Sequence, residues 1–248
     1  MKKSFLHDLN WKKLLGWILF VSLLASIVFS IYNICTTPEA LIAAEGERLR
    51  SDYILMLTEC VLGLIVMSIP SVLDRRPNID IPDAMYILYF VFLYCAIILG
   101  EVRNFYFVFP HWDTFLHCLS AMMLAIFGFT LVVALNDSPK ISLHLSPRFV
   151  CLFTFCFAVA TGALWEIYEF SFDGLLGMNM QKFRLEDGTL LVGREALIDT
   201  MDDLITDVIG ALIVSVAGFV TQKKKEAKVR EAAKKLKSAH TNKKNKEH

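Results

Sequence analysis

Apolar residues are gathered in six long blocks along the chain, and the segments between the blocks carry most of the charge. A bilayer core about 30 Å thick requires about 20 helical residues to cross it. The blocks that meet this requirement lie at roughly 14–34, 53–73, 84–102, 114–135, 148–170 and 199–220. They are too long and too uniformly apolar for the strands of a membrane barrel. The pattern therefore predicts an all-α fold, a polytopic membrane bundle of six transmembrane helices.

The same pattern divides the chain into three parts. We predict a cytoplasmic N-terminal segment at 1–13, a six-span membrane domain at 14–220 and a basic tail at 221–248. The first block is longer than the apolar region of a signal peptide, and no small-residue cleavage site follows it. Hydrophobic residues make up 55% of the 248 positions, and the mean hydropathy is +0.50, as expected of such a membrane protein. None of the six cysteines forms a CxxC pair, which argues against a zinc knuckle.

Charge is balanced over the whole chain but unevenly placed along it. The 25 basic and 25 acidic residues cancel. When the N-terminus is placed in the cytoplasm, nineteen basic residues fall inside and six fall in the outer loops. Lysine and arginine are enriched on the cytoplasmic side of membrane proteins. We therefore expect both termini to be cytoplasmic.

The tail from Gln222 to His248 contains eleven basic residues. It is interpreted either as a topology anchor, which we favour, or as a surface for anionic lipid head groups, worth about 1 kcal/mol per basic residue. Nucleic-acid binding is not predicted, because neither aromatic interleaving nor a recognisable nucleic-acid-binding fold accompanies the lysines. Membrane lipid is therefore the expected partner.

Ionisable residues inside the predicted spans lie at one level of the membrane, the outer one. These residues are Glu59, Glu101, Asp113, His117, Glu166, Glu169, Asp199, Asp202, Asp203 and Asp207. Such residues are costly in a bilayer and usually mark function. The apolar stretch from Val208 to Val220 is only thirteen residues long, so the last span must include Asp203 and Asp207.

Spacing groups several of these residues on shared helix faces. Asp113 and His117 are four residues apart, and Glu166 and Glu169 are three apart. Asp113 and Asp199 could alternatively cap helix N-termini, where aspartate is favoured. Glu59 and Glu101 could alternatively extend to the membrane interface or pair with Arg103.

Carboxylates so close together cannot all remain ionised without help. Proton sharing, partner arginines (Arg103, Arg184 and Arg194) and a bound cation are the available remedies. Mixed carboxylate and imidazole ligands suit Zn, Mn, Fe or Mg. We therefore expect a divalent metal ion as the cofactor, with Asp113, His117, Asp199 and Asp203 as its ligands and Glu166 and Glu169 as acid/base groups. The outer segment from Asp173 to Ile198, with a predicted turn at Asp187-Gly188, is a candidate cover for this site.

Three segments carry a resemblance to a known family: WDTFLH at 112–117, WEIYE at 165–169 and DTMDDLITDVIGAL at 199–212. Together they resemble the YjdF-like family of uncharacterised bacterial inner-membrane proteins. The matching positions are Asp113, His117, Glu166, Glu169, Asp199, Thr200, Asp203 and Gly210. The resemblance covers residues 84–220 and implies a multi-pass protein of the bacterial inner membrane. A looser similarity to VanZ-like envelope proteins places Asp207 at an asparagine position of that family. Neither family implies a substrate.

Three functions remain open from the sequence. The first is a membrane-embedded, hydrolase-like enzyme acting on a lipid or lipid-linked envelope substrate, and it predicts a metal with an open coordination position. The second is a cation or proton-coupled carrier, which predicts polar residues that continue toward the cytoplasmic side. The third is a structural or resistance-associated envelope protein with fully paired carboxylates. The one-sided placement of the charge favours the first over the second.

Overall fold

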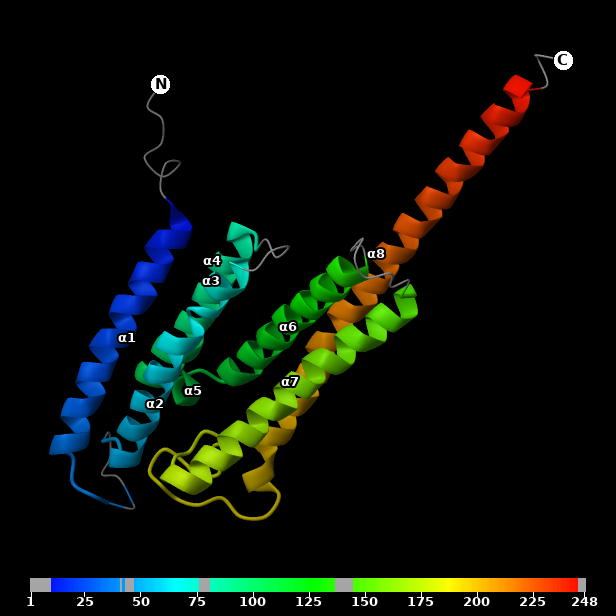
Figure 1. The fold of residues 1–248 in the computed structure, drawn as a ribbon. Coiled ribbons are helices and arrows are strands. Elements are labelled where there is room, and N and C mark those ends of the chain that lie inside the picture. Colours follow the sequence, from blue (N-terminus) through cyan, green and yellow to red (C-terminus); the bar gives the residue numbers. More distant parts are fainter. Residues whose placement is uncertain (1–9, 41, 43–46, 76–80, 137–144, 245–248) are drawn as a thin grey trace. The chain divides into compact units, whose positions relative to one another are not determined.

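The computed structural model describes residues 10–40, 42, 47–75, 81–136 and 145–244. It contains six helices that are long and apolar enough to cross a membrane, so the predicted all-α class and the number of spans are confirmed (Figure 1). These spans are Trp11–Thr36, Arg50–Asp74, Asp83–Val102, Trp112–Asn136, Pro147–Leu176 and Glu195–Leu236. Residues 1–9 of the predicted N-terminal segment and 245–248 of the predicted tail lie outside the described residues.

The first span is one helix and the second is interrupted. Helix α1 covers Trp11–Thr36, α2 covers Arg50–Val66 and α3 covers Ile69–Asp74. The interruption falls just before Pro70, which lacks a backbone N–H and is tolerated in the first turn of a new helix. At the start of α2, Asp52 accepts the backbone N–H of Leu49 at 2.9 Å, which fixes where the helix begins.

The third span changes its winding halfway. Helix α4 covers Asp83–Leu93 and continues as the π-helix η2 over Tyr94–Val102. The indole of Trp112 donates to the backbone carbonyl of Cys95 at 3.3 Å, inside the π-helical stretch. Wide helical turns of this kind are rare and often accompany functional sites. Here the stretch contains Glu101, one of the ionisable residues that the sequence places at the outer level of the membrane.

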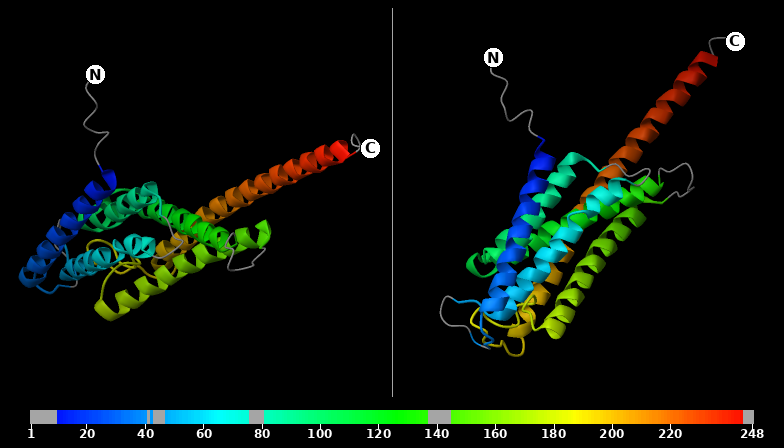
Figure 2. Two further views of the ribbon diagram at one scale, coloured as in Figure 1. Left: turned by 45° about the horizontal axis from the view of Figure 1, so that its top comes forward. Right: turned by 60° about the vertical axis from the view of Figure 1, so that its left-hand side comes forward.

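The second half of the chain consists of longer helices. A short α5 covers Phe105–Val108, α6 covers Trp112–Asn136, α7 covers Pro147–Leu176, the 3-10 helix η3 covers Glu195–Leu197 and α8 covers Ile198–Lys244. Helix α8 runs without a break from the last span into the basic tail (Figure 2).

The described residues form two compact units, and each has its own packing. The first contains Met1–Leu119 and Leu164–Leu204, and the second contains Ser120–Ala163 and Ile205–His248. In the first, α1, α2 and α4 lie side by side around an apolar cluster (Figure 2). Gly63 of α2 lets Leu23 of α1 and Ile97 of η2 approach closely, since an added Cβ would lie 2.6 Å from the Ile97 side chain.

The second unit is packed through small residues. Ala125 of α6, Ala158 of α7 and Ala211 of α8 are fully buried against one another. Small residues allow membrane helices to approach closely, because association in lipid depends on van der Waals contact.

Large apolar side chains of the first unit point outward, as Val28 and Phe170 do with 69% and 70% of their surface exposed. This outward apolar surface suits a lipid environment.

Candidate functional site

Three helix ends of the first unit carry the polar site. Asp113 and His117 lie in the first turns of α6, and Asp199 and Asp203 lie in the first turns of α8. Glu166 lies in the part of α7 that belongs to the same unit. Asp113 and Asp199 are within the first helical turn, where the helix dipole favours a negative charge.

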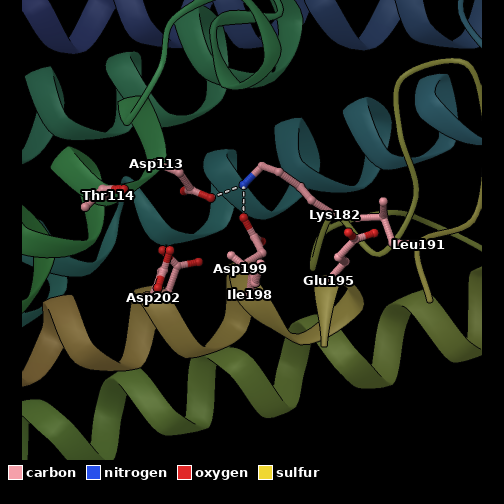
Figure 3. A pocket seen from close by; sticks show the side chains of 9 residues that line it. Asp113, Thr114, Lys182, Leu191, Glu195, Ile198, Asp199 and Asp202 are labelled. Carbon is pink, nitrogen blue, oxygen red and sulfur yellow. Dashed lines mark hydrogen bonds and ion pairs between the residues drawn. The ribbon is translucent and has the colours of Figure 1, made fainter. Parts of the chain in front are cut away.

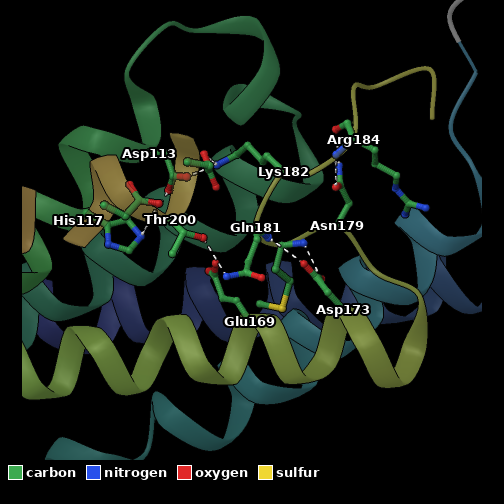
Figure 4. A network of polar contacts seen from close by, with 12 residues as sticks. Asp113, His117, Glu169, Asp173, Asn179, Gln181, Lys182, Arg184 and Thr200 are labelled. Atoms are coloured by element: carbon green, nitrogen blue, oxygen red, sulfur yellow. Dashed lines mark hydrogen bonds and ion pairs between the residues drawn. The ribbon is translucent and has the colours of Figure 1, made fainter. Parts of the chain in front are cut away.

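Asp113, His117 and Asp203 come together as a compact group, and Figure 4 shows Asp113 and His117 of this group. The Nε2 atom of His117 lies 3.8 Å from Oδ1 of Asp113 and 3.6 Å from Oδ2 of Asp203. One ligand atom from each residue lies within 4.8 Å of the others. Both His117 and Asp203 are buried, with 8% and 2% of their surface exposed. The predicted shared face of Asp113 and His117 is present, and α8 supplies the third side chain.

Lys182 of the outer segment reaches into this site. Its ammonium donates to Oδ2 of Asp113 and, at 3.0 Å, to Oδ1 of Asp199 (Figure 3). Its Nζ also lies 5.0 Å from the centre of the Tyr106 ring. Asp199 is therefore bound to the lysine, whereas Asp203 faces the histidine.

Charge and burial act in opposite directions on this lysine. Burial lowers the pKa of Lys182, but the carboxylates of Asp113 and Asp199 outweigh it and raise the pKa above its ordinary value. The lysine is therefore an ammonium ion throughout the physiological pH range. Burial also raises the pKa of the neighbouring Tyr106, so its hydroxyl stays protonated.

The outer segment is held to the helices by a set of polar contacts. Asp173, near the end of α7, accepts the backbone N–H groups of Met180 at 2.8 Å and Gln181 at 3.0 Å. The Gln181 side chain donates to the Thr200 hydroxyl of α8 at 2.8 Å (Figure 4). These bonds fix the residues immediately before Lys182.

The residues after Lys182 are fixed as well. The Asn179 side chain donates to the Arg184 carbonyl at 2.9 Å and accepts its N–H at 3.1 Å. The Arg184 guanidinium donates to Ser51 of α2 at 3.0 Å and lies 3.7 Å from Asp52. The predicted turn at Asp187-Gly188 is present, since the N–H of Gly188 bonds to the Leu185 carbonyl at 2.9 Å.

Glu166 and Glu169 lie on the same part of α7 but have different neighbours. Glu169 accepts a hydrogen bond from the Trp165 indole at 2.8 Å. Glu166 is 5% exposed and lies in the same unit as His117.

A pocket of about 330 Å³ opens beside the site (Figure 3). Its lining residues are Asp113, Thr114, Lys182, Leu191, Glu195, Ile198, Asp199, Asp202 and Asp203. Within the described residues, Oδ2 of the almost fully buried Asp203 accepts no hydrogen bond. A buried carboxylate oxygen without a donor is costly unless a cation approaches it.

The structure thus brings together most of the residues that the sequence singled out, and adds one. The sequence predicts Arg103, Arg184 and Arg194 as partners of the acids, and Lys182 is not among them. In the described residues Lys182 takes that role, while Arg184 pairs with Asp52. The sequence offered no periodic signal for Lys182, because it lies in a loop whose path depends on contacts distant in the chain.

Asp207 has a different setting from the other predicted acids. It is 2% exposed and belongs to the second unit, where it packs against Gly162 of α7. A Cβ added at Gly162 would lie 1.9 Å from its Oδ2 atom. The absence of a side chain at 162 is what makes room for this carboxylate.

Comparisons with known proteins place the chain in a family. The pattern of the predicted membrane protein family DUF2238 matches residues 15–224, and the chain belongs to this family. An uncharacterized protein of Thermotoga maritima is 27% identical over 156 residues, which cover 62% of this chain and 71% of the relative. No solved structure matches. The expected membership of an uncharacterised membrane-protein family is confirmed, and the protein is a multi-pass membrane protein with an Asp/His site.

Proposed function

We propose that Asp113, His117 and Asp203 bind one divalent metal ion. Ligand atoms about 2.1 Å from a common ion lie roughly 3.0–3.5 Å apart. The two carboxylate oxygens lie 3.6 and 3.8 Å from His117 Nε2 and within 4.8 Å of each other, so the two aspartates would have to move closer together around the ion. The observation that carries the proposal is the buried Oδ2 atom of Asp203 beside His117, which accepts no hydrogen bond from the residues that the structure describes. One imidazole with two carboxylates suits Zn, Mn or Fe.

The same geometry favours a hydrolase-like reaction. Catalytic metal sites commonly have three protein ligands and one open position for water. Asp113 and Asp203 both line the pocket, which could give water and a substrate access to the ion. Glu166 has the chemistry of a general base, because it is a buried carboxylate in the same unit as His117. A lipid or lipid-linked envelope substrate fits a pocket at the membrane interface.

The membrane and its orientation belong to the same proposal. The excess of lysine and arginine in the alternate loops and the tail supports the bacterial inner membrane with both termini in the cytoplasm. This orientation would place the Asp/His site and the pocket at the outer leaflet.

Elemental analysis of the purified full-length protein in detergent tests the metal site. We expect about one divalent ion per chain in the parent and its loss in His117→Ala and Asp203→Asn. Asp83→Asn is the matched control, because Asp83 is an exposed aspartate paired with Lys12 at 3.0 Å, and it should retain the ion. Glu166→Gln should also retain the ion, since the three ligands remain. A parent without metal after equilibration with Zn²⁺ and Mn²⁺ would refute the proposal.

A cation carrier is the second candidate, and buried polar residues of the second unit favour it. Thr154 of α7 and Ser215 of α8 are fully buried, and their hydroxyls have no hydrogen-bond partner in the described residues. Together with Asp207 they extend polar side chains beyond the first turns of α8. Purified protein in liposomes distinguishes the two functions. A Mn²⁺ or proton flux that Asp207→Asn abolishes would support the carrier, and no flux would support the hydrolase-like protein.

A further inference from the structure

Asp113 uses its two carboxylate oxygens for different neighbours. Its Oδ1 atom faces His117 at 3.8 Å, within the group proposed to bind the metal. Its Oδ2 atom accepts a hydrogen bond from Lys182. One carboxylate thus connects the proposed metal position with a second position that already holds a positive charge.

The second position has the composition of a cation site. Asp199 accepts from the Lys182 ammonium at 3.0 Å, and the Tyr106 ring lies 5.0 Å from the same nitrogen. Two carboxylates and an aromatic face are groups that attract a cation. The three side chains in the ion-pair group are only 19–21% exposed, so water screens them weakly.

The fold accepts backbone strain to bring the lysine to this place. Lys182 has a φ of +45°, in the left-handed region that residues other than glycine rarely adopt. The bonds of Asp173, Gln181 and Asn179 hold the chain on either side of it. Strain that surrounding contacts maintain is common where a side chain has a functional position.

The pocket around both positions is strongly acidic. Its lining includes five carboxylates, from Asp113, Glu195, Asp199, Asp202 and Asp203, and Lys182 is the only basic residue of that lining. Carboxylates gathered in one pocket repel one another unless cations or bound protons balance their charge. Asp199 also has an oxygen, Oδ2, that accepts no hydrogen bond in the described residues. The pocket therefore favours a positive charge at the Lys182 position in addition to the proposed metal ion.

We propose that the Lys182 ammonium occupies the second position of a two-cation centre, and that Asp113 bridges this position and the metal site. In two-metal centres the ions lie about 3.5–4 Å apart and stabilise the attacking and leaving oxygens together. Here a fixed ammonium supplies the second charge, so the native protein binds one ion. When the amine is removed, a second divalent ion takes its place on Asp113 and Asp199. The bridging part of this inference rests on the proposed metal site.

Mn²⁺ binding to the full-length protein in detergent tests this inference. The samples are the parent, Lys182→Ala and Lys12→Ala, and both the bound Mn²⁺ per chain and the electron paramagnetic resonance spectrum are measured. We expect Lys182→Ala to bind one Mn²⁺ more than the parent and to show the spectrum of an exchange-coupled ion pair. Lys12→Ala is the matched control, because Lys12 pairs with one exposed carboxylate, and its count should equal that of the parent.

The difference in bound Mn²⁺ per chain between Lys182→Ala and the parent tests the second cation position. The number of Mn²⁺ ions bound by the parent tests the proposed metal site. If Lys182→Ala binds no more Mn²⁺ per chain than the parent, the second cation position is refuted. If the parent in that case binds one Mn²⁺, the proposed metal site is still supported. A parent count of zero with one isolated ion in Lys182→Ala would support a cation position at Lys182 and refute both the metal site and the bridge. If Lys182→Ala is not monodisperse, Lys182→Gln replaces it under the same criteria. The double variant Lys182→Ala/Asp199→Asn should lose the additional ion.

Discussion

Asp203 and Asp207 are one helical turn apart on α8, and each is 2% exposed, yet they have different surroundings. Asp203 belongs to the first unit, lies 3.6 Å from a histidine nitrogen and lines a pocket. Asp207 belongs to the second unit and fills a notch left by Gly162. Burial alone therefore does not identify a ligand. The donor atoms of neighbouring side chains and access to a pocket separate the two aspartates.

The same contrast holds for the units as a whole. The polar end of the first unit combines carboxylates, a histidine and a lysine from α6, α7, α8 and the outer segment. The second unit is packed through alanine and glycine, with Ala125, Ala158 and Ala211 at its centre. The buried carboxylates of the first unit require cations as partners. The helices of the second unit instead require small side chains where they approach closely.

The largest expected difference is in metal affinity. His117→Ala removes one of three proposed ligands and should lower Mn²⁺ affinity by at least about 100-fold, because even changes outside the ligand shell cost 10–100-fold. Asp207→Asn should leave the affinity unchanged. Equilibrium binding on detergent-solubilised protein measures both. Equal losses in the two variants would break the distinction between the two aspartates.

The next effect concerns the notch in the second unit. Gly162→Ala places a Cβ 1.9 Å from Oδ2 and 2.8 Å from Cγ of Asp207, so one of the two helices or the carboxylate must shift. We expect a loss of about 1–3 kcal/mol in the free energy of unfolding. Asp207→Ala in the Gly162→Ala background should recover part of it. Unfolding by denaturing detergent provides the measurement, and an unchanged Gly162→Ala variant would contradict the packing.

A smaller and more local effect is expected in the outer segment. Asp173→Ala removes the acceptor of two backbone N–H groups, which should cost about 1–3 kcal/mol locally. Amide hydrogen exchange at Met180 and Gln181 should accelerate. Asp187→Ala is the control, because Asp187 is exposed and accepts from Thr189 within its own turn. Unchanged exchange at both amides in Asp173→Ala would show that other contacts hold the segment.

The smallest effect has the opposite sign. Gly174 lies in the helical part of α7, and an added Cβ would meet nothing within 4 Å. Gly174→Ala should therefore stabilise the protein by about 0.5–1 kcal/mol, since alanine reduces the entropy of the unfolded chain. The same unfolding assay compares it with Gly162→Ala. A destabilised Gly174→Ala would mean that this glycine has a role beyond the helix.

Local features of the sequence were sufficient for the spans and for part of the site. The thickness of a bilayer sets the length of each apolar block, so six spans could be predicted without any tertiary information. The i, i+4 spacing of Asp113 and His117 likewise placed both on one helix face, where the structure has them 3.8 Å apart.

Features that depend on how distant segments meet could not be predicted in this way. Lys182 reaches Asp113 only because the outer segment is tied to α7 and α8 by Asp173 and Gln181. The Asp207 side chain occupies the space beside Gly162, and this contact depends on the register of α7 and α8. The π-helical winding of Tyr94–Val102 leaves no mark in the hydropathy, because this stretch is apolar except for Glu101 and has no polar face that would show the number of residues per turn.

X-ray absorption spectroscopy of the Mn²⁺- or Zn²⁺-loaded parent tests the central claim most directly, because it reports the ligand atoms themselves. The account predicts a first shell of nitrogen and oxygen at about 2.0–2.2 Å that includes one imidazole. The imidazole signal should be absent from His117→Ala when this variant is loaded at a metal concentration high enough to offset its weaker binding. A shell of oxygen only, or thiolate sulfur at about 2.3 Å, would contradict the assignment of the metal to Asp113, His117 and Asp203.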